Sequence, residues 1–365
     1  MSEAEDIRFM SLALSLGRRG MGRTAPNPAV GCVVVKDGRI VGRGWTQPGG
    51  RPHAEPVALG QAGDAARGAT AYVTLEPCAH HGQTPPCANA LVDAGISRVV
   101  IATQDSDARV DGAGIAILRK AGVDVTMGIC EAKAQADHVG FFLRTEQGRP
   151  FVTLKLASSF DGRIATGTGE SQWITGPLAR RQVHALRARH DAVMVGGGTA
   201  RHDDPSLTVR GFGDVQQPAR VVVSRRLDLP LLSTLARTAK DIPVIVCHGR
   251  DADPVLQDTW RDLGATLLPC GTSGSQLDPH DILQQLGGHG FTRVFCEGGG
   301  ALSASLIEAD LVDELVGFTA GIVIGAEGLP NIGALGVETL AAAQRYALKS
   351  VSPVGEDICH TWTRV

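Results

Sequence analysis

His53-Ala54-Glu55, followed by Glu76-Pro77-Cys78 and then by Cys87, is the stretch on which the interpretation of this chain depends. One imidazole and two thiols are the three ligands that a zinc ion prefers in proteins. Three protein ligands leave the fourth tetrahedral position for water, which is the catalytic pattern rather than the structural one. The sequence therefore predicts a zinc centre that lowers the pKa of a bound water and makes hydroxide available.

Glu55 remains after the three ligands have been assigned. Two residues along a helix rotate a side chain by about 200°, so His53 and Glu55 are poorly placed as two ligands from one helical face. We interpret Glu55 as a proton shuttle beside the metal-bound water, because His-x-Glu followed by Pro-Cys is the signature of zinc nucleobase deaminases. The alternative is a structural zinc site in which His80 or His81 supplies a fourth ligand.

Length and composition describe an ordinary globular protein. The chain has 365 residues, 43% of them apolar and 20% charged, which suggests about two domains. A net charge of −3 and an aromatic content of 4% do not indicate binding to nucleic acid or to a membrane. The eight cysteines are scattered along the chain, unlike the disulfide framework of a small secreted protein.

The N-terminus begins with Glu3, Glu5 and Asp6, where a signal sequence would carry positive charge before an apolar run. No apolar run of the sequence reaches membrane-spanning length. We therefore expect a cytoplasmic protein with no membrane partner and no nucleic-acid partner. We also expect a homo-oligomer.

Strand and helix patterns alternate through the first half of the chain. The expected elements are a helix over 6–19 capped by Asp6, a hairpin over 30–41 turning at Asp37-Gly38, a helix over 53–61, a strand over 69–75, and helices over 87–94 and 115–121. The strand over 69–75 delivers Cys78 just beyond its carboxyl end. This alternation predicts a layered α/β/α domain.

A polar segment with Gly and Pro, Arg144 to Pro150, separates a second alternating series from the first. We place the domains at residues 1–147 and 148–365. The second series is expected to contain strands near 151–156, 192–195, 220–223, 244–246, 266–268 and 294–296, and helices near 177–189, 254–263 and 301–309.

Two glycine clusters follow strands of this second series. They are Gly196-Gly197-Gly198-Thr199 and Glu297-Gly298-Gly299-Gly300. Backbone N–H groups at such positions can bind phosphate. Neither cluster matches Gly-x-Gly-x-x-Gly or a Walker loop, so a tight turn is an equally good interpretation of each.

The motifs in both halves resemble the bifunctional deaminase/reductase family of riboflavin biosynthesis. The first half matches in Pro26-Asn27-Pro28, in His53-Ala54-Glu55, and in the long spacing from Cys78 to Thr84-Pro85-Pro86-Cys87. The second half matches in Lys155, Ser159-Phe160-Asp161-Gly162, Ser171-Gln172-Trp173, Arg187, Asp203 to Arg210, and Glu297-Gly298-Gly299. The resemblance runs from about Asp6 to about Gly325. It implies a cytidine-deaminase-like three-layer α/β/α domain followed by a dihydrofolate-reductase-like α/β domain.

The resemblance also implies the residues of both sites and the cofactors Zn²⁺ and NADPH. The zinc ligands are His53, Cys78 and Cys87, the proton shuttle is Glu55, and Asn27 contacts the pyrimidine. NADPH contacts are Ala157, Trp173, Thr199, Asp203, Ser224, Gly299 and Gly300. Substrate contacts are Ser171, Arg187, Leu207, Arg210 and Glu297, with Lys155 in the same pocket. From the residues alone, Asn27 also fits an Asx turn, the arginines fit solvated surface charges, and Trp173 fits a core position.

The implied function has two steps. Zinc hydroxide deaminates 2,5-diamino-6-(5-phosphoribosylamino)pyrimidin-4-one, and NADPH then reduces the ribosyl group to ribityl. The alternatives are a nucleic-acid or nucleoside zinc deaminase with an unrelated appended domain, and a zinc-stabilised nucleotide-binding regulator.

Two sites along the chain depart from the family pattern. Ser106-Asp107-Ala108 stands where prolines are frequent, and Gln83 stands where a basic residue is frequent. Both departures concern substrate binding, and neither touches the zinc ligands. Arg225 and Arg226 follow Ser224 and are expected either to face a 2′-phosphate or to be plain surface charges.

Overall fold

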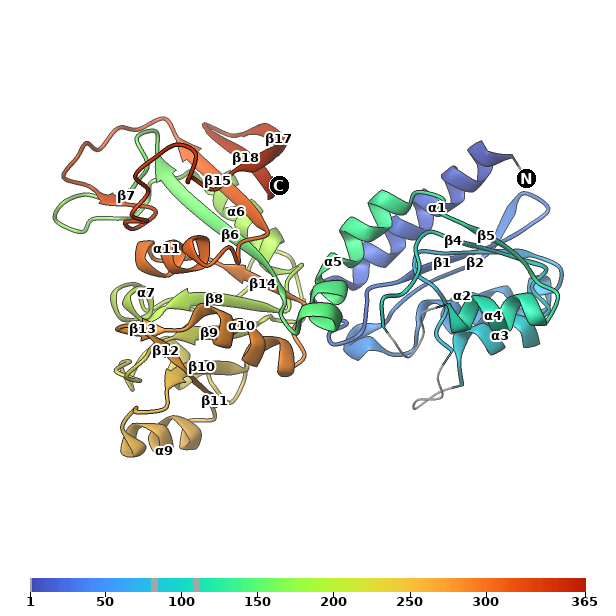
Figure 1. Ribbon diagram of the computed structural model, residues 1–365, viewed down its shortest axis with the longest axis horizontal. Coiled ribbons are helices and arrows are strands. Elements are labelled where there is room, and N and C mark those ends of the chain that lie inside the picture. The colour runs from blue at the N-terminus through green and yellow to red at the C-terminus, as the bar shows by residue number, and fades with distance from the viewer. Residues whose placement is uncertain (1, 80–84, 108–111) are drawn as a thin grey trace. The chain divides into compact units, whose positions relative to one another are not determined.

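The computed structural model describes residues 2–79, 85–107 and 112–365, and the chain forms two compact units, Met1–Gly148 and Arg149–Val365. The division falls after Gly148, next to the boundary expected after Gln147. Each unit has its own sheet, as the ribbon in Figure 1 shows. Each also has its own hydrophobic cores.

The first unit contains one five-stranded sheet. Its strands are β1 (Gly31–Lys36), β2 (Arg39–Trp45), β3 (Thr70–Val73), β4 (Arg98–Ile101) and β5 (Asp124–Met127). Its helices are α1 (Glu3–Gly17), α2 (Ala54–Ala62), α3 (Cys87–Asp93), α4 (Ala113–Lys120) and α5 (Glu131–Gln147), with 3₁₀ turns at Arg18–Gly20, Pro48–Gly50 and Gly63–Ala66. The strand order is β2-β1-β3-β4-β5. β1 runs antiparallel to both of its neighbours, whereas β3, β4 and β5 are parallel.

Helices cover both faces of this sheet, so the predicted three-layer α/β/α arrangement is confirmed. α1 and α5 pack on one face, where Phe9 and Ala134 join a core with Val33 and Tyr72. α2, α3 and α4 pack on the other face around Val34 and its neighbours. Figure 1 shows these two helical layers on either side of the sheet.

The predicted cap of α1 is wrong, because Asp6 lies inside the helix. Ser2 is the N-cap, and its hydroxyl accepts a hydrogen bond from the backbone N–H of Glu5. The Glu5 carboxylate in turn accepts one from the backbone N–H of Ser2, which completes a capping box. Asp6 is instead 4% exposed. Its carboxylate accepts the Tyr72 hydroxyl at 2.7 Å and the Arg98 guanidinium at 2.8 and 2.9 Å. Burial favours protonation, but these donors hold the pKa of Asp6 below its usual value.

The second unit is built on a nine-stranded sheet of order β11-β10-β9-β8-β14-β6-β15-β18-β17. These strands are β6 (Phe151–Ser159), β8 (Ala192–Gly196), β9 (Ala219–Val223), β10 (Val244–Gly249), β11 (Thr266–Cys270), β14 (Arg293–Cys296), β15 (Glu314–Ala320), β17 (Tyr346–Val354) and β18 (Asp357–Arg364). Every pair from β11 to β15 is parallel, and β18 and β17 add an antiparallel edge. Two small ladders pair β7 (Arg163–Ala165) with β16 (Leu329–Pro330) and β12 (Thr272–Ser273) with β13 (Gln276–Leu277).

Six helices cover the two faces of the large sheet. They are α6 (Pro177–Arg187), α7 (Gly197–Asp203), α8 (Thr234–Arg237), α9 (Pro254–Asp262), α10 (Pro279–Gly288) and α11 (Gly300–Glu308). The first four pack on one face around Val222 and Trp260, and α10 and α11 pack on the other around Met194. The expected strands and helices of this half are therefore present. The sequence prediction had no counterpart for three helices and seven strands, which are α7, α8, α10, β7, β12, β13, β15, β16, β17 and β18.

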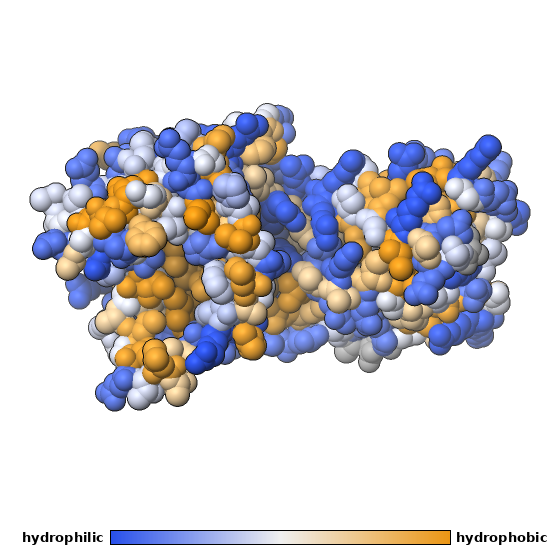
Figure 2. Space-filling model, turned by 90° about the horizontal axis from the view of Figure 1, so that it is seen from above, coloured by the Kyte–Doolittle hydropathy of each residue, from blue (hydrophilic) through white to orange (hydrophobic). Residues whose placement is uncertain are grey.

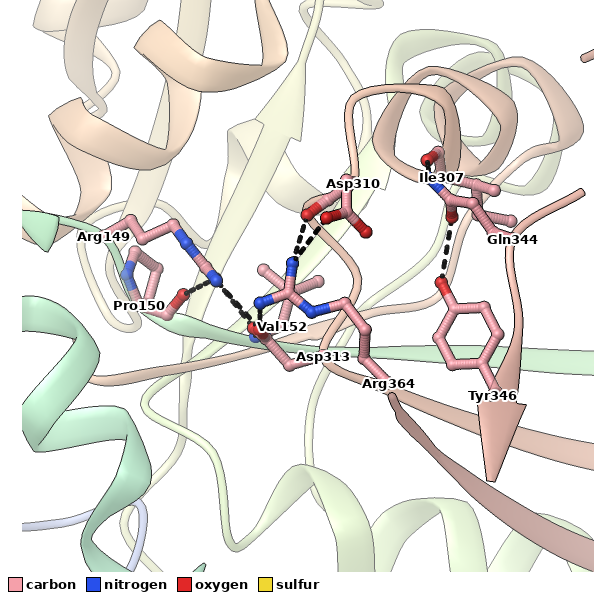
Figure 3. Close-up of polar contacts among 9 residues, drawn as sticks. All are labelled: Arg149, Pro150, Val152, Ile307, Asp310, Asp313, Gln344, Tyr346 and Arg364. Carbon is pink, nitrogen blue, oxygen red and sulfur yellow. Dashed lines mark hydrogen bonds and ion pairs between the residues drawn. The ribbon is translucent and has the colours of Figure 1, made fainter. Parts of the chain in front are cut away.

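A buried ion pair holds the start of the second unit. The Arg149 guanidinium donates to both carboxylate oxygens of Asp313, at 2.8 and 2.9 Å, and the two side chains are 7% and 5% exposed. Asp313 also accepts the Val152 N–H at 2.8 Å, and Arg364 approaches it at 3.4 Å. Figure 3 shows these groups converging, so the first residues of β6 are tied to the start of β15 and the end of β18.

The surface in Figure 2 carries hydrophilic residues on both units, interrupted by smaller apolar areas. The exposed large apolar side chains include Phe160 at 76%, Trp173 at 67% and Leu340 at 86%. Among residues 2–79, 85–107 and 112–365, no helix is long and apolar enough to span a bilayer.

Replacing Arg149 by Ala is expected to destabilise the second unit. The substitution leaves the Asp313 carboxylate buried without its main partner, and breaking such a pair typically costs about 3–5 kcal/mol. Urea denaturation of the full chain measures this change. Arg261→Ala is the matched control, because the Arg261–Asp258 pair is 52% and 76% exposed and such pairs are worth about 0–1 kcal/mol. Equal losses of stability in the two variants would contradict a stabilising role for the Arg149–Asp313 pair.

Candidate functional site

Three ligand atoms of the predicted zinc centre converge in the first unit. The Nδ1 atom of His53 lies 3.3 Å from the Sγ of Cys87 and 3.7 Å from the Sγ of Cys78. All three ligand atoms lie within 4.8 Å of one another, and no other such group of His, Cys, Asp or Glu occurs in the described part of the chain. This donor set fits zinc, and the residues bring it together without a fourth protein ligand among those described.

Local structure explains the convergence. His53 is the N-cap residue of α2, Cys87 is the first residue of α3, and Cys78 follows the carboxyl end of β3. Two helix N-termini therefore meet at the site, where their partial positive charge favours thiolates. The Cys87 backbone N–H donates to the Cys78 sulfur at 3.3 Å. The Cys87 thiol, the His53 imidazole and this N–H lower the pKa of the Cys78 thiol to about 4.

Glu55 lies in the first turn of α2, outside the set of three ligands. Its side chain is 3% exposed and faces the thiol of Cys87. Burial, with the negative charge of Cys78, raises the pKa of Glu55 to about 7. A carboxyl group with such a pKa can both accept and donate a proton near neutral pH, as a proton shuttle requires.

Glu76 organises the loops around the zinc ligands, a role that the sequence analysis did not assign. One carboxylate oxygen accepts the N–H groups of Gly114 at 3.0 Å and Ile115 at 3.2 Å. The other accepts those of Gly112 at 3.1 Å and Asp105 at 3.4 Å. The segment after β4 is thereby tied to the segment that carries Cys78. The only hint in the sequence was a Glu directly before Pro-Cys.

Asn27 holds the backbone that leads into His53. Its side-chain amide donates to the Gly50 carbonyl at 2.9 Å. Gly50 has a φ of 83°, and a Cβ there would lie 2.9 Å from the Asn27 Cβ, so the close approach requires glycine. Asn27 therefore shapes the loop before the zinc site, and its Oδ1 is not used in this bond.

The departures from the family pattern are only partly described. Gln83 and Ala108 lie outside the described residues, as do His80 and His81, the candidates for a fourth structural ligand. Asp107 is 8% exposed, and its N–H donates to the Asp105 carboxylate at 2.9 Å. Asp107 therefore sits in a loop held by Glu76 through Asp105.

In the second unit, Arg187 and Glu297 form a largely buried, forked ion pair. The Nε of Arg187 donates to one Glu297 oxygen, and its Nη2 donates to the other at 2.9 Å. A third donor of Arg187 reaches the Thr208 carbonyl at 2.8 Å. The two side chains are 11% and 10% exposed, so the alternative of a solvated surface charge is wrong for Arg187.

Lys155 on β6 lies beside this pair. Burial lowers the pKa of Lys155, against the opposing effect of Glu297. Burial favours protonation of Glu297, but Arg187 and Lys155 hold the pKa of that carboxyl below its usual value. The three residues form a charged cluster that a polar substrate can bind.

The remaining predicted substrate residues have different environments. Leu207 is 2% exposed with a φ of 54°, directly before Thr208, which binds Arg187. Arg210 is exposed, and its backbone N–H donates to His184 Nδ1 at 3.2 Å. Ser171 is half-buried. No contact of these side chains with the Arg187–Glu297 pair occurs among the described interactions.

The two glycine clusters meet at the carboxyl ends of β8 and β14. The Gly196 N–H donates to the Gly298 carbonyl at 3.1 Å, and Thr199 Oγ1 lies 3.5 Å from the same carbonyl. Gly299 has a φ of 96°, and a Cβ there would lie 2.9 Å from Thr199 Oγ1. The buried hydroxyl of Ser303 has no partner in the described residues and lies 2.8 Å from where a Cβ of Gly298 would stand. This cradle at the N-terminus of α11 fits a phosphate group.

The other predicted NADPH residues lie on two elements and two loops. Ala157 is on β6, Asp203 ends α7, and Ser224 follows β9 and donates to the Asp228 carboxylate at 3.0 Å. Trp173 is 67% exposed beneath the Arg180 guanidinium, which lies 4.5 Å from its ring centroid. A core role for Trp173 is therefore excluded, and its open face can meet a ligand.

Comparison with known proteins matches both units. Residues 3–103 match the cytidine and deoxycytidylate deaminase zinc-binding region, and residues 150–360 match the RibD C-terminal domain. The riboflavin biosynthesis protein RibD of Escherichia coli (strain K12) is 40% identical over 361 residues, covering 97% of this chain and 98% of the relative. That of Aquifex aeolicus is 41% identical over 353 residues, covering 97% of each.

The chain belongs to the RibD family.

Solved RibD structures have the same fold over the whole chain. Acinetobacter baumannii RibD superimposes with a TM-score of 0.90 at 39% identity, covering 100% of both chains. The Thermotoga maritima protein, described as a diaminohydroxyphosphoribosylaminopyrimidine deaminase/5-amino-6-(5-phosphoribosylamino)uracil reductase, superimposes with a TM-score of 0.87 at 33% identity, covering 100% of this chain and 99% of that one. The chain is therefore a bifunctional RibD enzyme of riboflavin biosynthesis, with a zinc-dependent deaminase domain and a reductase domain of the NADPH-using type.

Glu55→Gln is expected to retain zinc and to lose deamination by about 10²–10⁴-fold, because the amide cannot move a proton. Metal analysis beside an ammonia-release assay measures both properties. Near-normal turnover in the variant would remove Glu55 from the catalytic machinery.

Gly299→Ala is expected to raise the KM for NADPH. The added methyl group is strained at a φ of 96° and approaches Thr199, so the cradle must shift. Gly288→Ala at the end of α10 is the control, because a Cβ there meets nothing within 4 Å. Steady-state kinetics measures the KM for NADPH of the two variants. Equal KM values would argue against the binding of a phosphate group at this loop.

Proposed function

We propose that the first unit deaminates 2,5-diamino-6-(5-phosphoribosylamino)pyrimidin-4-one and that the second reduces the ribosyl group of the product to ribityl with NADPH. The main support is the His53, Cys78 and Cys87 cluster beside a buried Glu55. The Arg187–Glu297 pair and the glycine cradle of the second unit support the reductase step. The substrates are those after which the two activities of the Thermotoga maritima relative are named.

In the deaminase site, His53 Nδ1 and the thiolates of Cys78 and Cys87 would hold the zinc ion. Bound there, zinc supplies an acidified water as the nucleophile. Glu55 would carry a proton from the attacking water to the departing amine, so the same carboxyl group would act first as a base and then as an acid. The amide nitrogen of Asn27 holds Gly50, and its Oδ1 would accept hydrogen bonds from the amino groups of the pyrimidine.

In the reductase site, the charged cluster binds the phosphoribosyl and pyrimidine groups. Glu297 accepts hydrogen bonds from hydroxyl or ring N–H groups, and Arg187 keeps this carboxylate ionised and oriented. Lys155 donates to the substrate from β6. Exposed Arg210 offers a forked donor to the ribose phosphate, and Ser171 and Leu207 complete the pocket.

NADPH supplies the hydride, and this chain's residues orient the cofactor. The N–H groups at Gly299 and Gly300 would receive the diphosphate, together with the Ser303 hydroxyl, which has no partner among the described residues. The remaining contacts with NADPH would come from Trp173, Ala157, Thr199, Asp203 and Ser224.

We also propose that the protein works in the cytoplasm as a homo-oligomer. Free thiols fit a reducing compartment, and all eight cysteines are unpaired.

Removing zinc with a chelator is expected to abolish ammonia release while leaving reduction of the deaminated substrate intact. The two sites lie in separate compact units with separate cores. A zinc-stabilised regulator would instead unfold, and circular dichroism of the chelated protein detects this. Loss of both activities on chelation would contradict the assignment of deamination to the first unit and reduction to the second. Ammonia release that returns when zinc is added would support this assignment.

A further inference from the structure

Three side chains meet beside the glycine cradle, at the carboxyl ends of β8 and β9. Arg201 of α7 donates to the Asp228 carboxylate at 2.9 Å, and the Ser224 hydroxyl donates to the same oxygen at 3.0 Å. A Cβ at Gly197 would lie 3.1 Å from the Ser224 Oγ and 3.2 Å from a terminal nitrogen of Arg201. The Arg201 guanidinium thus occupies the space that glycine leaves open at the start of α7.

The other arginines near this edge are placed differently. Arg225 donates to Asp251 at 2.9 Å and to the Ser275 carbonyl at 3.1 Å, which attaches it to the β12–β13 hairpin. Arg226 is exposed and contributes charge near Asp251. Arg201 is the arginine that shares a partner with Ser224. The sequence alone had pointed to Arg225 and Arg226 because they follow Ser224 directly.

We propose that Arg201 and Asp228 together set the choice between NADPH and NADH, with Arg201 and Ser224 binding the 2′-phosphate of the adenosine ribose. This inference rests on the proposed cofactor site, whose cradle shares α7 and the end of β8 with the cluster. Guanidinium groups bind phosphate through forked, charge-assisted hydrogen bonds. The Ser224 hydroxyl can turn from Asp228 to a phosphate oxygen.

Asp228 acts as the competing anion. Its pair with Arg201 is open to solvent, the two side chains being 41% and 52% exposed, and exposed pairs are weak. A phosphate dianion can therefore replace the Asp228 carboxylate as the partner of Arg201. With NADH, the same carboxylate can accept the 2′-hydroxyl, which is how acidic residues hold the ribose of NAD in other folds. Arg201 thus favours NADPH, and Asp228 limits that preference.

The test compares binding and kinetics in the full-length protein. Calorimetry measures the dissociation constants of adenosine 2′,5′-bisphosphate and AMP, and kinetics measures kcat/KM for NADPH and NADH. Arg201→Ala is expected to weaken the bisphosphate at least about tenfold, equivalent to about 1.4 kcal/mol, with AMP unchanged, and to lower the NADPH/NADH ratio through the KM of NADPH. Asp228→Asn keeps an acceptor for Ser224 and is expected to raise the ratio.

Two further variants complete the test. Arg261→Ala on α9 is expected to change neither the affinity for the bisphosphate nor the NADPH/NADH ratio of kcat/KM. Unchanged bisphosphate affinity in Arg201→Ala, with AMP binding retained, overturns the inference, as does a loss of preference that follows only Arg225→Ala with Arg226→Ala. AMP binding also reports folding, so a misfolded variant is recognised. Absence of NADPH-dependent reduction in the unmodified protein would instead contradict the proposed function, which separates the two failures.

Discussion

Parallel strand order is the constraint on which both sites depend. Neighbouring parallel strands end at the same edge of a sheet, so residues that follow them are brought together from distant parts of the chain. In the first unit, β3 and β4 place Cys78 and the loop after residue 103 at one edge. In the second, β8, β9 and β14 bring together the two glycine clusters and Ser224. Helices that begin at these edges then add N–H groups aimed at the ligands.

Three buried glutamates show how environment decides function at these edges. Glu76 is surrounded by backbone N–H groups and serves as a structural acceptor. Glu297 is held ionised by Arg187 and Lys155 and can bind polar groups. At Glu55, burial and the negative charge of Cys78 outweigh the opposing effect of His53 and raise the pKa of the carboxyl group to about 7. The same side chain therefore becomes a scaffold, an anion or a proton carrier according to the charges and donors around it.

Much of the fold followed from local patterns, and the misses have physical causes. The parallel strands are continuous apolar runs, and the 30–41 hairpin has an Asp-Gly turn, so these elements were predictable. β17 lies at the edge of its sheet with seven consecutive exposed residues, and it therefore lacks the alternation that marks a half-buried strand. Asp6 looked like a cap because Asp favours that position, but Arg98 and Tyr72, far away in sequence, bind it inside the helix. Such long-range partners leave no local trace.

The sequence by itself indicated the metal site, because one His, two Cys and a nearby Glu are the residue types of a catalytic zinc centre, although it left His80 or His81 open as a fourth ligand. It also determined the two-domain organisation and the positions of the glycine clusters. Only the tertiary structure decided which charged residues act together. Arg187 and Glu297 are distant in sequence yet form one buried pair, and Arg201, rather than the adjacent Arg225, shares Asp228 with Ser224. Pairing of charges depends on distance in space and on burial, and neither is encoded in the spacing along the chain.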